Sequence, residues 1–336
     1  MLEVLARIPG RPKVASKYVE TDVARATVLL RGFHGDLCGF EEESGLEEAL
    51  FWSDFATTRL NVPAQSNTAA YQQQINEIIA RIQQRQVSKV VLSRPSHLRT
   101  TRADAQRTFA ELEKRYPNCT VFALKHPEYG HWMGASPEVL FEEIDGGFRS
   151  MSLAGTRLSG ASDWGDKERE EQNFVTKEIQ KNLAAFGGRV RQQAEETLLA
   201  GPVEHLLTWV ETDAANAPAV DILEALHPTP AICGTPTAPA REVIASVEQY
   251  DRGLYTGYLA FMTGGLHATV LLRTMQWSES GITFYAGGGI TKDSVPLNEW
   301  METEYKISAL KDAVQFKGQQ QSTRHIGHYK RLRKQG

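Results

Sequence analysis

The stretch Tyr285-Ala286-Gly287-Gly288-Gly289-Ile290 is followed nine residues later by Glu299-Trp300-Met301-Glu302 and then by Lys306. A glycine run at the end of a strand lets backbone N–H groups approach an anion closely. The helix predicted after it presents Glu299, Glu302 and Lys306 on one face, at positions i, i+3 and i+7. This combination suits a cation together with a carboxylated substrate. A glycine hairpin beside a solvated helix face explains the same residues. Other segments of the chain are needed to choose between these two interpretations.

Composition and charge limit the class of protein. The 336 residues are 41% apolar and 23% charged, with a net charge of −4 at pH 7. These values describe a soluble globular protein with a sizeable core and no general attraction to nucleic acid. No apolar run reaches the length of a membrane span, and the first residues lack the apolar segment of a signal peptide. We therefore expect a cytoplasmic protein that binds neither membrane nor nucleic acid.

The cysteines and the last residues of the chain carry no recognisable site. Cys38, Cys119 and Cys233 lie far apart without Cys-x-x-Cys spacing, so neither a disulfide framework nor a zinc site is indicated. From Lys317 onward, six Lys and Arg residues occur without an acidic residue. Such a run is typical of a disordered, solvated tail.

Hydrophobic periodicity divides the chain into an α+β pattern. Residues 1–60 give only weak strand signals, whereas the isoleucines of segment 67–82 form one apolar face of a helix. β-Branched and aromatic residues between turn residues predict strands at 89–94, 119–125, 130–134, 138–143, 147–154, 254–262, 268–275 and 282–286. Further helices are predicted from about 104, at 166–185, near 219–226 and 239–247, and from 297 to 314.

A series of short motifs follows in order along residues 66–314. They are Lys89-Val90-Val91-Leu92-Ser93-Arg94, Gly134-Ala135-Ser136-Pro137-Glu138, Ala154-Gly155-Thr156-Arg157, Lys167 through Glu171, His205-Leu206, His227-Pro228-Thr229-Pro230-Ala231, Arg252-Gly253-Leu254-Tyr255-Thr256-Gly257, Arg273 and the ending quoted above. In this order they resemble the motifs of the chorismate-utilising enzymes, the family that includes anthranilate synthase component I. They are most similar to those of isochorismate synthases.

The resemblance implies a fold and a domain organisation. The implied fold is the α+β chorismate-binding fold, in which large, mostly antiparallel sheets pack as a sandwich with helices on the outside. We expect residues 66–314 to form the catalytic domain, as one structural unit with N-terminal strands in residues 1–65. That N-terminal part is shorter than is usual in the family. Residues 317–336 are expected to be a disordered basic tail.

The resemblance also implies catalytic and metal-binding residues. Chorismate carries two carboxylates and a C4 hydroxyl that must leave as a nucleophile arrives, so its site needs anion binding, a base and an acid. Lys89 is implied as the base that deprotonates a water attacking C2, and Glu138 as the acid that protonates the departing hydroxyl. Burial would favour the neutral form of each group. Mg²⁺ is implied at Glu171 and Glu302, with Glu299 as a direct or water-mediated ligand.

The remaining residues implied by the resemblance bind the substrate. Arg273 would hold a carboxylate through its planar guanidinium, and His205 would orient the substrate. Glycine backbone N–H groups would meet carboxylate oxygens. The implied set is Gly155, Thr156, His205, Ala231, Ile232, Tyr255, Arg273, Gly287, Gly288 and Lys306.

Each of these residues has an ordinary interpretation when it is taken alone. Lys89 can be an edge-strand lysine that blocks sheet pairing, and Glu138 a common strand-end carboxylate. Glu171 lies in a charge-rich segment that is typical of a solvated helix face. Arg273 can form a structural ion pair, and a lone histidine between apolar neighbours, such as His205, is more often a core residue than a catalyst.

Within the family, the residues favour isochorismate synthase, an isomerase. Lys89 resembles the water-activating lysine of the isochorismate and salicylate synthases, where the amino-transferring enzymes have a small residue. Salicylate synthases typically place threonine where this chain has Ala231, and the Leu-Leu-Glu-Ser segment of anthranilate synthases is not found. We expect a monomer that acts on chorismate without an amidotransferase subunit, in menaquinone or siderophore synthesis. Salicylate synthase, anthranilate or aminodeoxychorismate synthase component I, and a catalytically weak binding or partner subunit remain alternatives.

Overall fold

The computed structural model describes residues 1–59, 63–158, 160, 163–200, 203–213 and 217–318. Within these residues, one hydrogen-bonded network joins 17 strands, and its pairings are antiparallel. Strands β6 and β19 form a separate small sheet. The predicted α+β class with a large antiparallel sheet is confirmed. Most of the predicted basic tail, from residue 319 onward, lies outside the described residues.

The strands and helices have the following bounds. The strands are β1 Leu2–Arg7, β2 Val14–Thr21, β3 Val28–Arg31, β4 Leu37–Gly45, β5 Lys89–Arg99, β6 Ala103–Asp104, β7 Thr120–His126, β8 Gly130–Ser136, β9 Val139–Ile144, β10 Gly147–Leu158, β11 Val190–Gln192, β12 Glu196–Ala200, β13 Val203–Thr212, β14 Gly234–Thr235, β15 Tyr258–Phe261, β16 His267–Val270, β17 Thr274–Ser278, β18 Gly281–Ile290 and β19 Gln315–Phe316. The helices are the short 3₁₀ turn η1 Val23–Arg25, and α1 Glu48–Ser53, α2 Thr68–Gln83, α3 Ala105–Arg115, α4 Asp166–Ala184, α5 Ala219–Leu226, α6 Thr237–Val247 and α7 Pro296–Lys311.

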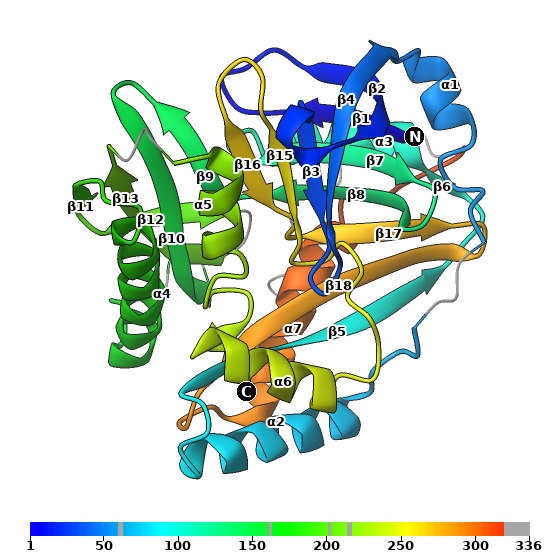
Figure 1. Cartoon of the computed structure of the whole chain (residues 1–336). Coiled ribbons are helices and arrows are strands. Elements are labelled where there is room, and N and C mark those ends of the chain that lie inside the picture. The colour runs from blue at the N-terminus through cyan, green and yellow to red at the C-terminus, as the bar shows by residue number, and fades with distance from the viewer. Residues whose placement is uncertain (60–62, 159, 161–162, 201–202, 214–216, 319–336) are drawn as a thin grey trace.

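Helices cover the outer faces of the sheet network (Figure 1). Helix α4 packs along β10 and β13, α2 and α6 both contact β5, and α7 packs on β18. The N-terminal strands belong to the same network, since β1 pairs with β7 and β3 pairs with β15. None of the helices in the described residues is long and apolar enough to cross a bilayer.

Helix α2 shows how local sequence sets an element and its packing. The Asn67 side chain accepts a hydrogen bond from the backbone N–H of Ala70 at 2.9 Å and so caps the helix. One face of the helix, spaced at helical intervals, is buried: Tyr71, Ile75, Ile78 and Ile82. This face packs against Val90 and Leu92 of β5 in one core cluster. Burial of the isoleucine face therefore fixes α2 beneath the strand that begins with Lys89.

Three predicted strands differ from the observed ones. The strand predicted at 268–275 is split into β16 and β17, because Arg273 takes a left-handed backbone conformation with φ of 48°. The strand predicted from 254 begins only at Tyr258, after a turn in which Thr256 has φ of 63°. Strand β18 continues through the glycine run to Ile290, so these glycines extend a strand and form no turn. Strands β11 to β13 were not predicted: β11 and β12 are short and largely exposed and carry little hydrophobic pattern, whereas β13 is ten residues long and largely buried.

The pairing of β5 with β18 places the glycine run Gly287-Gly288-Gly289 beside the buried strand β5. Their register runs from Val90 opposite Ile290 to Arg99 opposite Gly281. Residues 89–96 of β5 are all buried. A strand buried on both faces presents side chains to two sides of the protein. Residues of alternate positions on β5 can therefore reach different neighbours, which is what places Lys89 and Arg94 in separate environments.

The packed core predicts a test of stability. Leu112 of α3 is fully buried in an apolar cluster with Phe109, Val121 and Ala123. Leu112→Ala should lower the free energy of unfolding by about 2–5 kcal/mol, because the removed methyl groups leave a cavity. Urea unfolding followed by circular dichroism measures this loss. A change below about 1 kcal/mol would contradict close packing at this position.

Candidate active site

A cavity of about 90 Å³, large enough for several water molecules, lies among β5, β10, β13, β18, α4 and α7. Its walls come from segments that are far apart in the sequence. Most of the predicted site residues line it: Glu138, Gly155, Glu171, His205, Ala231, Ile232, Tyr255, Arg273, Gly287, Glu302 and Lys306. The motifs gave only the order of these residues along the chain, and the fold brings them together around one cavity.

Four predicted residues are placed differently. Lys89 lies one contact behind the cavity wall, against Glu171. Gly288 and Glu299 are not among the lining residues, and a Cβ on Gly288 would lie 3.4 Å from Glu299 Oε2. The backbone of Thr156 pairs with that of His205 in the β10–β13 ladder.

Two lysine–glutamate pairs border the cavity. Lys89 is completely buried, and its Nζ lies 2.7 Å from Glu171 Oε1. Lys306 Nζ lies 2.7 Å from Glu302 Oε1 and donates a hydrogen bond to the Gly287 carbonyl at 2.8 Å. Two of the carboxylates implied as metal ligands are thus neutralised by an ammonium group, Glu171 by a lysine of another element and Glu302 by a lysine one turn later on the same helix. Burial is tolerated because each charge has a partner.

Glu138 has a different environment. Its side chain is 2% exposed, and within the described residues its Oε1 has no hydrogen-bond partner. Burial raises the pKa of Glu138 to about 8, against the lowering effect of the Lys89 charge. The carboxyl group is therefore protonated at neutral pH. A buried, protonated carboxyl beside a cavity can act as a general acid.

His205 and Arg273 hold each other in a defined orientation. Arg273 donates from Nη2 to His205 Nε2 at 3.1 Å. Because a guanidinium only donates, Nε2 is the unprotonated ring nitrogen, and Nδ1–H donates to the Gly155 carbonyl at 3.2 Å. Burial, with the Arg273 charge, lowers the pKa of His205 well below its usual range, which agrees with a neutral ring. His205 therefore orients Arg273, and its Nε2 is not a proton donor.

The glycine run contributes alternate residues to the cavity. Gly287 pairs with Ser93 and Gly289 with Val91. The N–H groups of Ser93 and Val91 bond elsewhere, to Glu248 and to the Cys233 carbonyl, so these are the non-hydrogen-bonded pairs of the ladder. Gly287 and Gly289 consequently turn their backbone groups away from β5. Of the predicted backbone donors Gly155, Thr156, Gly287 and Gly288, the last pairs with Leu92 in the ladder, between the two glycines that line the cavity.

Gly289 also lies against the Lys89–Glu171 ion pair, and its lack of a side chain leaves room for both charged groups. A Cβ at this position would lie 2.4 Å from Glu171 Oε1 and 2.8 Å from Lys89 Cε. Any side chain would displace one of them. Strand periodicity could have indicated Gly289, which shares a face with Gly287. The other lining residues that the motif analysis missed are Val91, Pro137, Leu153, Ala154, Thr256, Leu272, Tyr285 and Ala286.

Arg94 fixes α7 against β5. Its guanidinium stacks on the Trp300 ring, 3.8 Å from the ring centroid, and Nε donates to Thr303 Oγ1 at 2.6 Å. A further ion pair joins Arg94 to Glu304. Trp300 and Thr303 are the residues that follow Glu299 and Glu302. The helix motif therefore contains both the residues that face the cavity and those that lock the helix in place.

Glu171, Glu299 and Glu302 are the side chains implied as ligands of a metal ion. Among the residues described, no group of three His, Cys, Asp or Glu side chains converges on one point. Glu171 and Glu302 both line the cavity, whereas Glu299 is buried and does not. Mg²⁺ is commonly held by one or two carboxylates together with water and substrate oxygens, so a two-carboxylate set fits it and a three-glutamate cage does not.

The fold thus places a buried acid and a buried lysine beside one cavity. The model of the chorismate binding enzymes matches residues 53–315. The chain belongs to this family.

Named relatives agree with the family. Isochorismate synthase 2 of Arabidopsis thaliana is 34% identical over 243 residues, which are 66% of this chain and 42% of that protein. An isochorismate synthase of Pasteurella multocida is 31% identical over 72% of this chain and 60% of its own length. The chain thus spans about half the length of these curated relatives. The menaquinone-specific isochorismate synthase structure from Escherichia coli has a TM-score of 0.77 at 21% identity, covering 94% of this chain and 89% of that chain, which shows the same fold.

The environment of Glu138 predicts a pH dependence of stability. The pKa of Glu138 is about 8 in the folded state and 4.5 in the unfolded chain. The contribution of the protonated carboxyl to the free energy of unfolding is therefore fully present below pH 4.5 and is lost as the pH rises to 8. Relative to Glu138→Gln, which cannot titrate, the wild type should lose roughly a few kcal/mol across this window. Urea unfolding of both proteins at pH 5 and pH 8 measures the difference. A difference that stays constant with pH would mean that Glu138 is ionised in the fold.

Proposed function

We propose that this protein is an isochorismate synthase, which converts chorismate to isochorismate. The proposal rests above all on one observation: a completely buried lysine and a buried, protonated carboxyl serve one cavity whose other polar groups suit carboxylates. Charged side chains are rarely buried without a purpose, and strongly shifted pKa values are common at functional sites. The family match and the names of the relatives point to the same chemistry.

The proposed reaction is a displacement with one water entering and one leaving. Lys89 first gives up to solvent the proton that it carries in its pair with Glu171. As a neutral amine it then accepts a proton from a water molecule, and the water oxygen forms a bond to C2. The ring double bonds shift, and the bond between C4 and its hydroxyl oxygen breaks. Glu138 donates its proton to that oxygen, which leaves as water. A proton returned from Lys89 to Glu138 through solvent restores both groups.

The remaining groups hold the substrate in place. Arg273, fixed by His205, supplies a planar cation for one carboxylate. Lys306 and the backbone groups of Gly287 and Gly289 supply positive charge and donors at the other end of the lining. Ile232 and Tyr255 form apolar walls. Positioned groups of this kind contribute to binding in the ground state and to orientation in the transition state.

Glu171 and Glu302 would hold Mg²⁺ in this proposal. When bound, Mg²⁺ would neutralise carboxylate charge of the protein and of the substrate together. Both side chains line the cavity, and their exposed fractions are 15% for Glu171 and 27% for Glu302. Their lysine partners, Lys89 and Lys306, keep them neutralised otherwise. The chain therefore presents two acidic side chains whose charge is compensated by ammonium groups.

The activity itself is the first test. Purified protein with chorismate and Mg²⁺ should form isochorismate without glutamine, ammonia or a partner protein, and liquid chromatography identifies the product. Pyruvate with salicylate would assign the salicylate branch, and an aminated product that requires ammonia would assign the amino-transferring branch. Binding of chorismate without turnover would indicate a partner subunit.

The acid and the base give a second test. Lys89→Ala and Glu138→Gln should each lower kcat by roughly 10² or more, the usual effect of losing a positioned proton-transfer group. KM should change far less, and the double variant should be little worse than either single one. Lys125→Ala is the matched control, since Lys125 is also buried but pairs with Glu3 and Asp54 outside the cavity. A Lys89→Ala enzyme with near-normal kcat would rule out the proposed base.

A further inference from the structure

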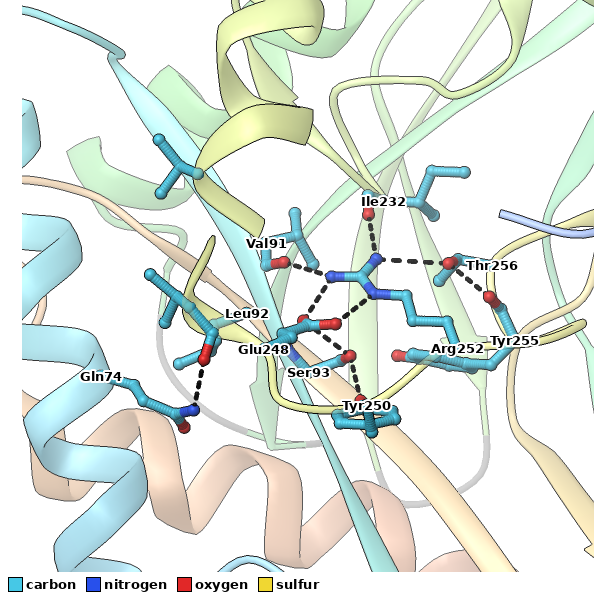
Figure 2. A network of polar contacts seen from close by, with 12 residues as sticks. Gln74, Val91, Leu92, Ser93, Ile232, Glu248, Tyr250, Arg252, Tyr255 and Thr256 are labelled. Atoms are coloured by element: carbon cyan, nitrogen blue, oxygen red, sulfur yellow. Dashed lines mark hydrogen bonds and ion pairs between the residues drawn. The ribbon is translucent and has the colours of Figure 1, made fainter. Parts of the chain in front are cut away.

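Arg252 and Glu248 form a buried ion pair (Figure 2), and Arg252 contacts residues that line the cavity. Arg252 is completely buried, and Glu248 is 7% exposed. The guanidinium makes five hydrogen bonds, which equals its number of N–H groups. Nε donates to Glu248 Oε2 at 2.8 Å, and Nη2 donates to Glu248 Oε1 at 2.6 Å and to the Val91 carbonyl at 2.7 Å. Nη1 donates to the Ile232 carbonyl at 2.9 Å and to Thr256 Oγ1 at 3.2 Å.

Three of the five bonds join separate segments of the cavity wall, and the other two hold Glu248. Val91, Ile232 and Thr256 all line it, and they belong respectively to β5, to the segment before β14, and to the turn before β15. Figure 2 shows these segments meeting at the guanidinium. Arg252 and Glu248 are not themselves among the lining residues. The pair can therefore affect a substrate only through the walls that it holds.

Glu248 extends the connection along β5. Its Oε1 accepts from the backbone N–H of Ser93 at 2.7 Å and from Ser93 Oγ at 2.8 Å. The Ser93 hydroxyl is also hydrogen-bonded to Tyr250. Ser93 and Gly287 form a non-hydrogen-bonded pair of the ladder, so the Ser93 N–H points away from β18. The Glu248 carboxylate accepts this N–H at the opposite edge of β5. The same ion pair thus fixes β5 at two points, at Val91 and at Ser93.

Stability alone gives a weak reason for such a pair. Desolvation of two charges can exceed their mutual attraction, and apolar replacements of buried ion pairs are often neutral or stabilising. What an apolar pair cannot reproduce is a planar set of donors that satisfies two carbonyls and a hydroxyl from three segments at once. The geometry therefore points to a role in fixing the relative positions of those segments.

We propose that Arg252, held by Glu248, is a positioning residue that sets the shape of the substrate cavity by tying β5, the Ile232 segment and the Thr256 turn together. The proposal rests on the proposed function for its kinetic consequence, although the structural consequence stands independently. Loosened walls would weaken contacts that the substrate makes in both its ground state and its transition state. Loss of such uniform binding raises KM and leaves kcat nearly unchanged.

Hydrogen exchange tests the structural part without any need for activity. Arg252→Lys keeps the positive charge but has three N–H donors at one point, so at least two of the five acceptors lose their partner. Exchange followed by mass spectrometry should speed up about tenfold or more in peptides 229–235 and 252–258, and far less in α3 and β7. Glu248→Gln, which keeps the shape of the carboxylate, should produce the same local pattern and serves if Arg252→Lys does not fold.

Kinetics test the consequence for the substrate. In both variants the KM for chorismate should rise about tenfold, while kcat stays within about threefold of the wild type. The double variant Arg252→Lys, Glu248→Gln should be no worse than the poorer single variant. Leu112→Ala is the control for lost stability, because its cavity lies outside the substrate site. At a comparable fall in melting temperature it should leave KM unchanged.

The outcomes separate the two proposals. Faster exchange confined to the segments that Arg252 joins, together with a raised KM, supports the positioning role. Uniformly faster exchange, or a KM shift that Leu112→Ala reproduces, would overturn it and leave the pair as a stability element. A wild type that forms no isochorismate overturns the proposed function, and the exchange pattern of the variants then still decides whether Arg252 holds the three segments.

Discussion

The structure depends on one strand, β5, whose residues 89–96 are all buried and whose side chains meet different partners in turn. Lys89 pairs with Glu171 beside the cavity, and Val91 lines the cavity while its carbonyl accepts from Arg252. Arg94 stacks on Trp300 and so holds α7 in place. Pairing with β18 then sets the glycines opposite these residues. A shift of β5 by one residue would reverse every one of these contacts, because side chains alternate along a strand.

Buried charge is the second feature on which the site depends. Lys89 and Glu138 are buried and Arg273 is partly buried, so each charged form needs a compensating interaction. The chain compensates in three ways: an ion pair at Lys89, a retained proton at Glu138, and a neutral histidine acceptor at Arg273. These arrangements exist before any substrate arrives. Such preorganisation is the main source of electrostatic catalysis, since no reorganisation is needed during the reaction.

Local sequence was sufficient for most elements and for the residues of the motifs. The capped, isoleucine-faced helix α2 and the apolar strand β5 follow from periodicity and propensity. Other features follow only from tertiary contacts. The break between β16 and β17 depends on the backbone conformation of Arg273. Gly289 lines the cavity and Gly288 does not, because the pairing register of β18 decides which glycines face away from β5. The partnership of Arg252 with Glu248 was also not predicted, because its remaining partners come from segments up to 161 residues away.

The central claim is that a buried lysine and a buried acid act on one displacement, in which solvent supplies the entering oxygen. Isochorismate formed from unlabelled chorismate in ¹⁸O-labelled water measures this most directly, because mass spectrometry counts the oxygen atoms that come from solvent. The account predicts one ¹⁸O atom in isochorismate, in the hydroxyl group at C2, and none in recovered chorismate during the initial phase of the reaction. Isochorismate that contains no label would show that the C4 hydroxyl itself migrates, and would contradict the roles of both Lys89 and Glu138.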